Sequence, residues 1–107
     1  MERPAEIDPE RALELLHGGA AVFIDIRDPA SFREAKIPGA VQLDETTVGP
    51  FLEAADPARP VVVYCYHGIS SLGAAAWLRE KGLAEVYSLS GGFEGWRWEH
   101  PCEGGSA

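Results

Sequence analysis

The sequence predicts a single α/β domain in which a mainly parallel sheet is flanked by helices on both faces. Short apolar segments rich in valine and isoleucine alternate with segments of helical composition. The connections between successive strands are too long for β-hairpins, so the strands are expected to run parallel. A length of 107 residues supports one hydrophobic core, and residues 1–107 are therefore expected to form one domain.

The first half of the chain has clear helix signals. Asp8 is a good N-cap residue, and Pro9 follows it at the first helical position. The same pair recurs at Asp28 and Pro29, where it starts a shorter helix. The expected elements are a helix from 9 to the glycines at 18 and 19, a strand over 20–26, a helix over 29–34, a type II turn over 37–40 and a brief strand over 41–43.

The second half is organised around a buried strand that leads into a helix. Residues 61–64 are β-branched or aromatic, and residues 71–81 have the alanine and leucine content of a helix that Gly82 stops. Gly49 and Pro50 are expected to break segment 44–55 into a loose turn and a second helix. The remaining expected elements are a connector over 56–60, a strand over 85–89, a turn over 90–92, a helix over 93–99 and a flexible tail from about residue 101.

The composition narrows the classes of function. A formal net charge of −8 argues against nucleic acid and anionic membranes as partners, because both attract basic surfaces. No apolar run approaches the ~20 residues that span a bilayer. The N-terminal segment also lacks a signal-peptide pattern, so a cytoplasmic location is expected, with Cys65 and Cys102 unpaired. We expect a monomer or a weak dimer.

Cys65 stands where the buried strand ends and the following helix is about to begin. A loop that enters a helix N-terminus directs several unpaired backbone N–H groups to one place, and the helix dipole adds positive potential there. Such a site favours an anion and lowers the pKa of a thiol. The sequence therefore indicates a reactive cysteine with an anionic ligand. The alternative is a small apolar residue buried at a strand end.

Three other uses of this cysteine fit the sequence less well. A tyrosine phosphatase has histidine before its cysteine and arginine six positions after it. This chain has Tyr64 and Ser71 there, so the bidentate clamp for a phosphoryl group is missing. Cys65 and His67 supply only two zinc ligands, and no metal site is expected. A thioredoxin-like site needs a Cys-x-x-Cys pair, which the sequence lacks.

Four motifs, in order along most of the chain, resemble those of the single-domain rhodanese family. The motifs are Asp25-Ile26-Arg27-Asp28, Ile37-Pro38-Gly39-Ala40, Cys65-Tyr66-His67-Gly68-Ile69-Ser70-Ser71 and Gly91-Gly92-Phe93-Glu94-Gly95-Trp96. The resemblance implies a rhodanese-like fold with a five-stranded parallel sheet. It also implies transfer of sulfane sulfur from thiosulfate to cyanide or another thiophilic acceptor, such as a small thiol or thioredoxin, without a cofactor.

In this family role Cys65 is the nucleophile that carries the sulfur as a persulfide. Thiosulfate is a dianion that the N–H groups and hydroxyls of the loop would hold. A loop this short, with Ser71 six positions after Cys65, resembles sulfurtransferases more than phosphatases of the same superfamily. The expected substrate-binding residues are Tyr66, His67, Gly68, Ile69, Ser70 and Ser71. A persulfide carrier, or a non-catalytic module that docks a protein partner, is the alternative.

Neighbouring residues are expected to support the loop. Asp25 and Arg27 should hold loops by hydrogen bonds without touching substrate. Gly68 allows a curl with positive φ, while the hydroxyls of Ser70 and Ser71 are expected to cap the next helix and donate to ligand oxygens. The core anchors expected among the aromatic residues are Trp77, Phe93 and Trp96.

Two features depart from the family pattern. The loop has no lysine or arginine between Cys65 and Ser71, where many rhodaneses have one. His67 is then either a charge partner of the thiolate or a solvent-facing residue. Ile69 stands where asparagine is expected, so the rim of the loop is more apolar. This change favours a protein or a larger thiol as the sulfur acceptor.

Overall fold

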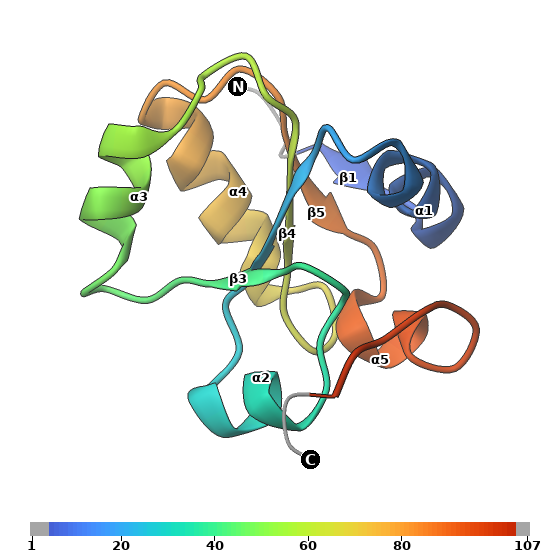
Figure 1. Cartoon of the computed structure of the whole chain (residues 1–107). Helices are drawn as coiled ribbons and strands as arrows, with labels where there is room; N and C mark the ends of the chain where they lie inside the picture. The colour runs from blue at the N-terminus through green and yellow to red at the C-terminus, as the bar shows by residue number, and fades with distance from the viewer. Residues whose placement is uncertain (1–4, 105–107) are drawn as a thin grey trace.

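The computed structural model describes residues 5–104 and contains a five-stranded parallel sheet (Figure 1). The strand order is β1-β5-β4-β2-β3, so β4 is the central strand. The strands are β1 (Glu6–Ile7), β2 (Val22–Asp25), β3 (Val41–Gln42), β4 (Val61–Tyr64) and β5 (Val86–Leu89). The predicted α/β fold with a parallel sheet is confirmed.

Helices cover both faces of the sheet. They are α1 (Pro9–Gly18), α2 (Pro29–Glu34), α3 (Val48–Ala54), α4 (Ser70–Glu80) and α5 (Gly92–Trp96). Helices α1 and α5 lie on one face, where Tyr64 and Trp96 are core residues, and α3 and α4 lie on the other, with Val63 and Leu78. Alternate residues of β4 therefore enter two separate cores, which explains its uninterrupted apolar sequence. No helix within residues 5–104 is long and apolar enough to cross a membrane.

The predicted aspartate caps are confirmed at two helix starts. The Asp8 carboxylate accepts a hydrogen bond from the Arg11 N–H at 2.8 Å, and the Asp28 carboxylate accepts one from the Ser31 N–H at 3.1 Å. Each bond satisfies an N–H group that has no partner inside the helix. Gly19 ends α1 with a φ of 76°, a backbone conformation that favours glycine.

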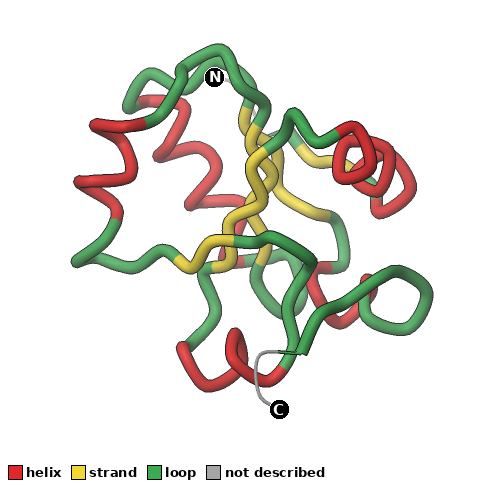
Figure 2. Tube along the Cα trace, viewed as in Figure 1, coloured by secondary structure: helices red, strands yellow, loops and turns green. Residues whose placement is uncertain are grey.

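Three elements differ from the expected ones (Figure 2). Segment 44–55 contains the expected turn, at 45–47, and the expected helix, but α3 already begins at Val48. Gly49 and Pro50 therefore lie in its first turn, where backbone N–H groups need no helical partner, instead of before it. Strand β1 has no counterpart among the expected elements, since two residues are too few for a periodic pattern. The last helix, α5, ends at Trp96 instead of residue 99.

The C-terminal segment returns to the domain near α2. Lys36 and Glu103 pair as an isolated antiparallel bridge, with N–H···O distances of 2.9 and 2.8 Å. The Glu103 carboxylate also accepts a hydrogen bond from the Gly39 N–H at 3.1 Å. The structure thus attaches Glu103 to the turn over 37–40, whereas a flexible tail was expected from about residue 101. Residues 105–107 lie outside the described part of the chain.

Candidate active site

Cys65 directly follows β4 and lies at the carboxyl end of the central strand. The backbone N–H groups of Gly68 and Ser71 donate hydrogen bonds to its Sγ at 3.2 and 3.3 Å. The side chain is 8% exposed, so the sulfur is largely withdrawn from bulk water. Gly68 has a φ of 86°, the positive value expected where the loop curls around the cysteine. Loop N–H groups thus converge on the sulfur.

These contacts stabilise the thiolate form of Cys65. Burial raises the pKa of the Cys65 thiol, but the Ser71 hydroxyl and the N–H groups of Ser71, Gly68 and His67 outweigh this effect. The pKa is therefore lowered from the ordinary value of 9.0. The thiol of Cys102 behaves in the opposite way, because desolvation raises its pKa. The two free cysteines are thus chemically distinct.

The start of α5 holds the loop in place. The carbonyl groups of Cys65 and Tyr66 accept hydrogen bonds from the N–H groups of Phe93 at 2.8 Å and Glu94 at 2.9 Å. Gly92 has a φ of 61°, and a Cβ at this position would lie 2.6 Å from the Cys65 carbonyl oxygen. Only a glycine allows the two backbone segments to approach this closely.

The serines at the start of α4 are arranged differently from the expectation. The N-cap residue is Ile69, and no side-chain hydrogen bond caps this described helix, so the predicted serine cap is wrong. Ser70 is instead the first helical residue. Ser71 is 0% exposed, and its Oγ lies 3.4 Å from the Cys65 Sγ and 2.7 Å from the Ser88 Oγ. The Ser71 hydroxyl therefore contacts the sulfur from inside the protein and is not directed at a ligand.

Asp25 and Arg27 form a buried ion pair at the end of β2. The Arg27 Nη2 and Nε donate to one Asp25 carboxylate oxygen at 2.6 and 3.0 Å, and Nη2 also donates to the Ala35 carbonyl at 2.6 Å. The guanidinium lies 5.0 Å from the ring centre of Tyr66 and 4.2 Å from that of Phe93. The pair thus contacts the segment after α2, the cysteine loop and α5. Its supporting role stays a prediction.

The outer part of the loop is exposed. Ile69 is 74% exposed, and His67 is also exposed, with its ring centre 6.2 Å from that of Tyr66. The Tyr66 hydroxyl donates to the Ser31 Oγ at 3.1 Å, which links the loop to α2. Among the described residues, backbone N–H groups donate to the Cys65 sulfur and the Ser71 Oγ lies beside it, and no imidazole bonds to it. A catalytic role for His67 stays a prediction.

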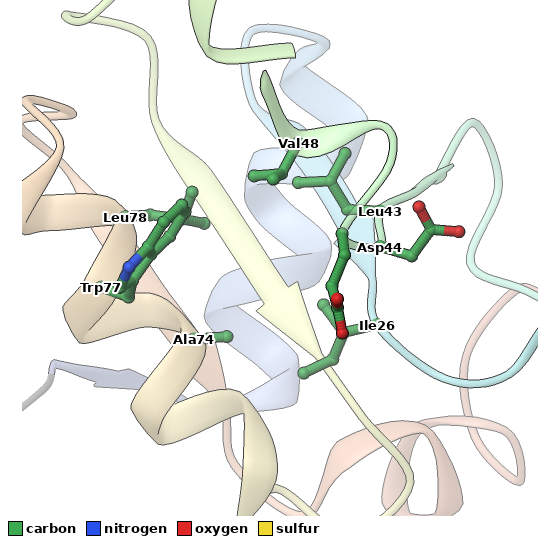
Figure 3. A pocket seen from close by; sticks show the side chains of 8 residues that line it. Ile26, Leu43, Asp44, Val48, Ala74, Trp77 and Leu78 are labelled. Atoms are coloured by element: carbon green, nitrogen blue, oxygen red, sulfur yellow. The ribbon is translucent and has the colours of Figure 1, made fainter. Parts of the chain in front are cut away.

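An apolar pocket of about 250 Å³ lies beside α4 (Figure 3). Trp77 lines it and is 41% exposed, so the expectation that Trp77 is a core anchor is wrong. Trp96 and Phe93 are buried, as predicted. In the close-up, the pocket residues of α4 lie opposite those of the β2 end, the β3 end and α3, which are Ile26, Leu43, Asp44 and Val48.

Two contributors to this site were not among the expected site residues. Gly92 was assigned only to a turn and to a family motif, although two adjacent glycines before a helix indicate a close backbone approach. Ser88 is a fully buried hydroxyl in β5. A lone polar residue in an otherwise apolar strand was the available signal for it. Both act through contacts between segments far apart in the sequence.

Comparison with known proteins places this geometry in a family. The rhodanese-like domain family matches residues 8–99. A thiosulfate sulfurtransferase of Pseudomonas putida, GlpE, is 50% identical over 97 residues, which cover 91% of this chain and 88% of that protein. A solved rhodanese-like domain from Anabaena sp. has a TM-score of 0.82 at 27% identity, covering 97% of this chain and 80% of that one. A thiosulfate sulfurtransferase structure from Pseudomonas aeruginosa has a TM-score of 0.84 at 25% identity, covering 98% of this chain and 21% of that one. Because the family match spans residues 8–99, which include the cysteine loop, and a relative is 50% identical over 91% of the chain, the chain belongs to the rhodanese-like domain family.

Proposed function

We propose that this chain is a thiosulfate sulfurtransferase that passes the outer sulfur of thiosulfate to a thiophilic acceptor through a persulfide on Cys65. The observation that carries the proposal is the loop in which the N–H groups of Gly68 and Ser71 donate to a cysteine sulfur with a lowered pKa. A thiolate is the nucleophilic form of cysteine. The 50% identity to a relative named thiosulfate sulfurtransferase supports the choice of substrate.

The reaction proceeds in two displacement steps. The Cys65 thiolate attacks the outer sulfur of thiosulfate; a bond forms between Sγ and that sulfur, and the sulfur–sulfur bond of thiosulfate breaks. Sulfite leaves with the electron pair. An acceptor such as cyanide then attacks the terminal sulfur of the persulfide, which releases thiocyanate and returns the thiolate. Covalent catalysis of this kind divides one difficult transfer into two easier ones.

The same loop is suited to the negative charge in each step. Before the attack the charge is on Sγ, and afterwards it is on the terminal sulfur. Backbone dipoles fixed by folding stabilise such charge without reorganising during the reaction. Thiosulfate would meet backbone N–H groups of the loop that do not bind the Cys65 sulfur, and no lysine or arginine lies between Cys65 and Ser71. We therefore expect a modest affinity that depends on ionic strength.

Mass spectrometry of the intact protein after thiosulfate treatment tests the first step. The wild-type chain should gain the mass of one sulfur atom and lose it on addition of cyanide, with thiocyanate as product. Cys65→Ala should gain none, whereas Cys102→Ala, the matched control, should behave as the wild type. An adduct on Cys65→Ala, or none on the wild type, would exclude the persulfide on Cys65.

The exposed Ile69 favours a protein thiol as one acceptor. Its side chain is 74% exposed at the rim of the cysteine loop, where it would contact a docked partner before the sulfur does. A chain that accepts sulfur from thiosulfate but turns over slowly with cyanide would act as a persulfide carrier. Comparison of cyanide, glutathione and reduced thioredoxin as acceptors separates the carrier from the enzyme.

A further inference from the structure

Ser88 is a buried hydroxyl that the proposed reaction does not use. It lies in β5, pairs in register with Val63 of β4, and is 0% exposed. Its Oγ is 2.7 Å from the Ser71 Oγ, which is itself 3.4 Å from the Cys65 Sγ. The three side chains thus form a continuous row from β5 through the first turn of α4 to the cysteine.

The Ser71 hydroxyl has one proton and two polar neighbours. If this proton is directed to Ser88, Ser71 faces the sulfur only as an acceptor, which suits a protonated thiol. If Ser88 donates to Ser71, the Ser71 proton is free to point at the sulfur, which suits a thiolate. The Ser71–Ser88 bond can run in either direction. The direction of the Ser71–Ser88 hydrogen bond therefore decides whether the Cys65 sulfur faces the proton or a lone pair of the Ser71 hydroxyl.

We propose that Ser88 is a positioning residue for Cys65: its buried hydroxyl donates to the Ser71 Oγ and thereby directs the Ser71 proton to the cysteine sulfur. When the sulfur is a thiolate, both hydroxyls donate in the same direction along the row. Hydrogen bonds in such a chain polarise and strengthen one another, most of all where the last acceptor is an anion. Both serines are fully buried, so water does not compete for these bonds.

Charged groups near the loop do not replace this contribution. Around Cys65, the titratable side chains are Asp25 at the end of β2, Arg27 just after it, Tyr64 at the end of β4, Tyr66 and the exposed His67 on the loop, and Glu94 on α5. Asp25 and Arg27 bind each other, and Glu94 interacts with Trp98 and Arg97. Within residues 5–104, the side-chain hydroxyl that reaches the sulfur is that of Ser71. Its orientation is therefore a specific point of control.

A double-mutant cycle read out on the Cys65 thiol tests the proposal. The rate of Cys65 alkylation by iodoacetamide is measured against pH in the wild type, Ser88→Ala, Ser71→Ala and the double variant, all in the Cys102→Ala background. Ser88→Ala should raise the thiol pKa and slow alkylation at neutral pH by roughly two- to fivefold. The same substitution should have no further effect when Ser71 is already alanine, because Ser88 acts through Ser71.

Matched variants separate the hydroxyl from packing. Ser88→Thr keeps the hydroxyl and should retain the wild-type dependence of the alkylation rate on pH. Ser88→Val has the shape of threonine without the hydroxyl and should match Ser88→Ala. The comparison of Ser88→Thr with Ser88→Val also tests the proposal if Ser88→Ala does not fold. Ser90→Ala, which removes a hydroxyl bound to Glu6, is the control with no expected shift. An unchanged profile in Ser88→Val, or equal shifts with and without Ser71, would overturn the proposal. Alkylation needs no thiosulfate, so these results stand apart from the sulfurtransferase assay.

Discussion

Replacement of Gly92 by alanine should disrupt the cysteine loop, whereas replacement of Gly91 should not. Both glycines have positive φ, 61° and 77°. Alanine at either position meets the same backbone strain. The two differ in surroundings: a Cβ at Gly92 would lie 2.6 Å from the Cys65 carbonyl oxygen, while a Cβ at Gly91 would meet only the Gly95 Cα at 3.8 Å. The pair therefore isolates the contact between α5 and the loop.

The magnitudes follow from this difference. A left-handed conformation costs a residue with a Cβ about 1–2 kcal/mol, of which the stiffer unfolded chain returns roughly 0.4–1 kcal/mol. Gly91→Ala should thus lose about 1 kcal/mol of unfolding free energy. Gly92→Ala adds about 1–3 kcal/mol of overpacking and about 1 kcal/mol for each weakened bond from Phe93 and Glu94. Its total loss should be about 4–6 kcal/mol.

Thermal denaturation and activity measure the two effects separately. At about 4 °C per kcal/mol for a domain of this size, Gly92→Ala should lower Tm by roughly 16–24 °C and Gly91→Ala by about 4 °C. A loop displaced by the new methyl group should also reduce thiocyanate formation in the folded protein by about tenfold to a hundredfold. Equal melting temperatures, or full activity of Gly92→Ala, would refute the idea that Gly92 sets the position of the loop.

Three further predictions follow from the site. At neutral pH iodoacetamide should modify Cys65 faster than Cys102, because the Cys65 thiol ionises below the ordinary pKa of 9.0. Peptide mapping over a pH series measures the alkylation rate of each cysteine, and equal rates would contradict the lowered pKa of Cys65. Arg27→Met should leave the Asp25 carboxylate buried without its partner and lower the unfolding free energy by about 3–5 kcal/mol in urea denaturation. A loss under about 1 kcal/mol would show that the pair does not hold the loops. Ile69→Asn should slow sulfur transfer to reduced thioredoxin and leave cyanide turnover near wild type; equal losses with both acceptors would exclude a docking role for this side chain.

The local parts of the fold could be predicted from the sequence, because short-range chemistry determines them. Asp8 and Asp28 cap helices through residues three positions away, and β4 is central because its four residues are all apolar or aromatic. Trp77 shows the limit of this reasoning. A tryptophan in an alanine-rich helix favours burial, but the face it occupies depends on which segment packs opposite, and here a pocket lies there.

The candidate site could be predicted in part for the same reason. The position of Cys65 between a strand and a helix is a local feature, and so are the N–H groups of its loop. The contacts of Gly92 and Ser88 are not local, because they depend on the register of β4 against β5 and on where α5 begins. Neither is fixed by periodicity or composition. The burial of the Ser71 hydroxyl against Ser88 is likewise set by the packing of α4 on β5 and not by the helix start alone.

The acidic character of the chain is compatible with a dianionic substrate. A net charge of −8 opposes the approach of thiosulfate, but at physiological ionic strength this repulsion is screened within about 8 Å. The charge of Arg27 is matched by Asp25 and does not supply attraction. What remains is a set of neutral N–H donors, which act only at contact distance. Repulsion should thus weaken binding without weakening the chemical step, because the donors that stabilise the Cys65 thiolate do not depend on the net charge of the protein.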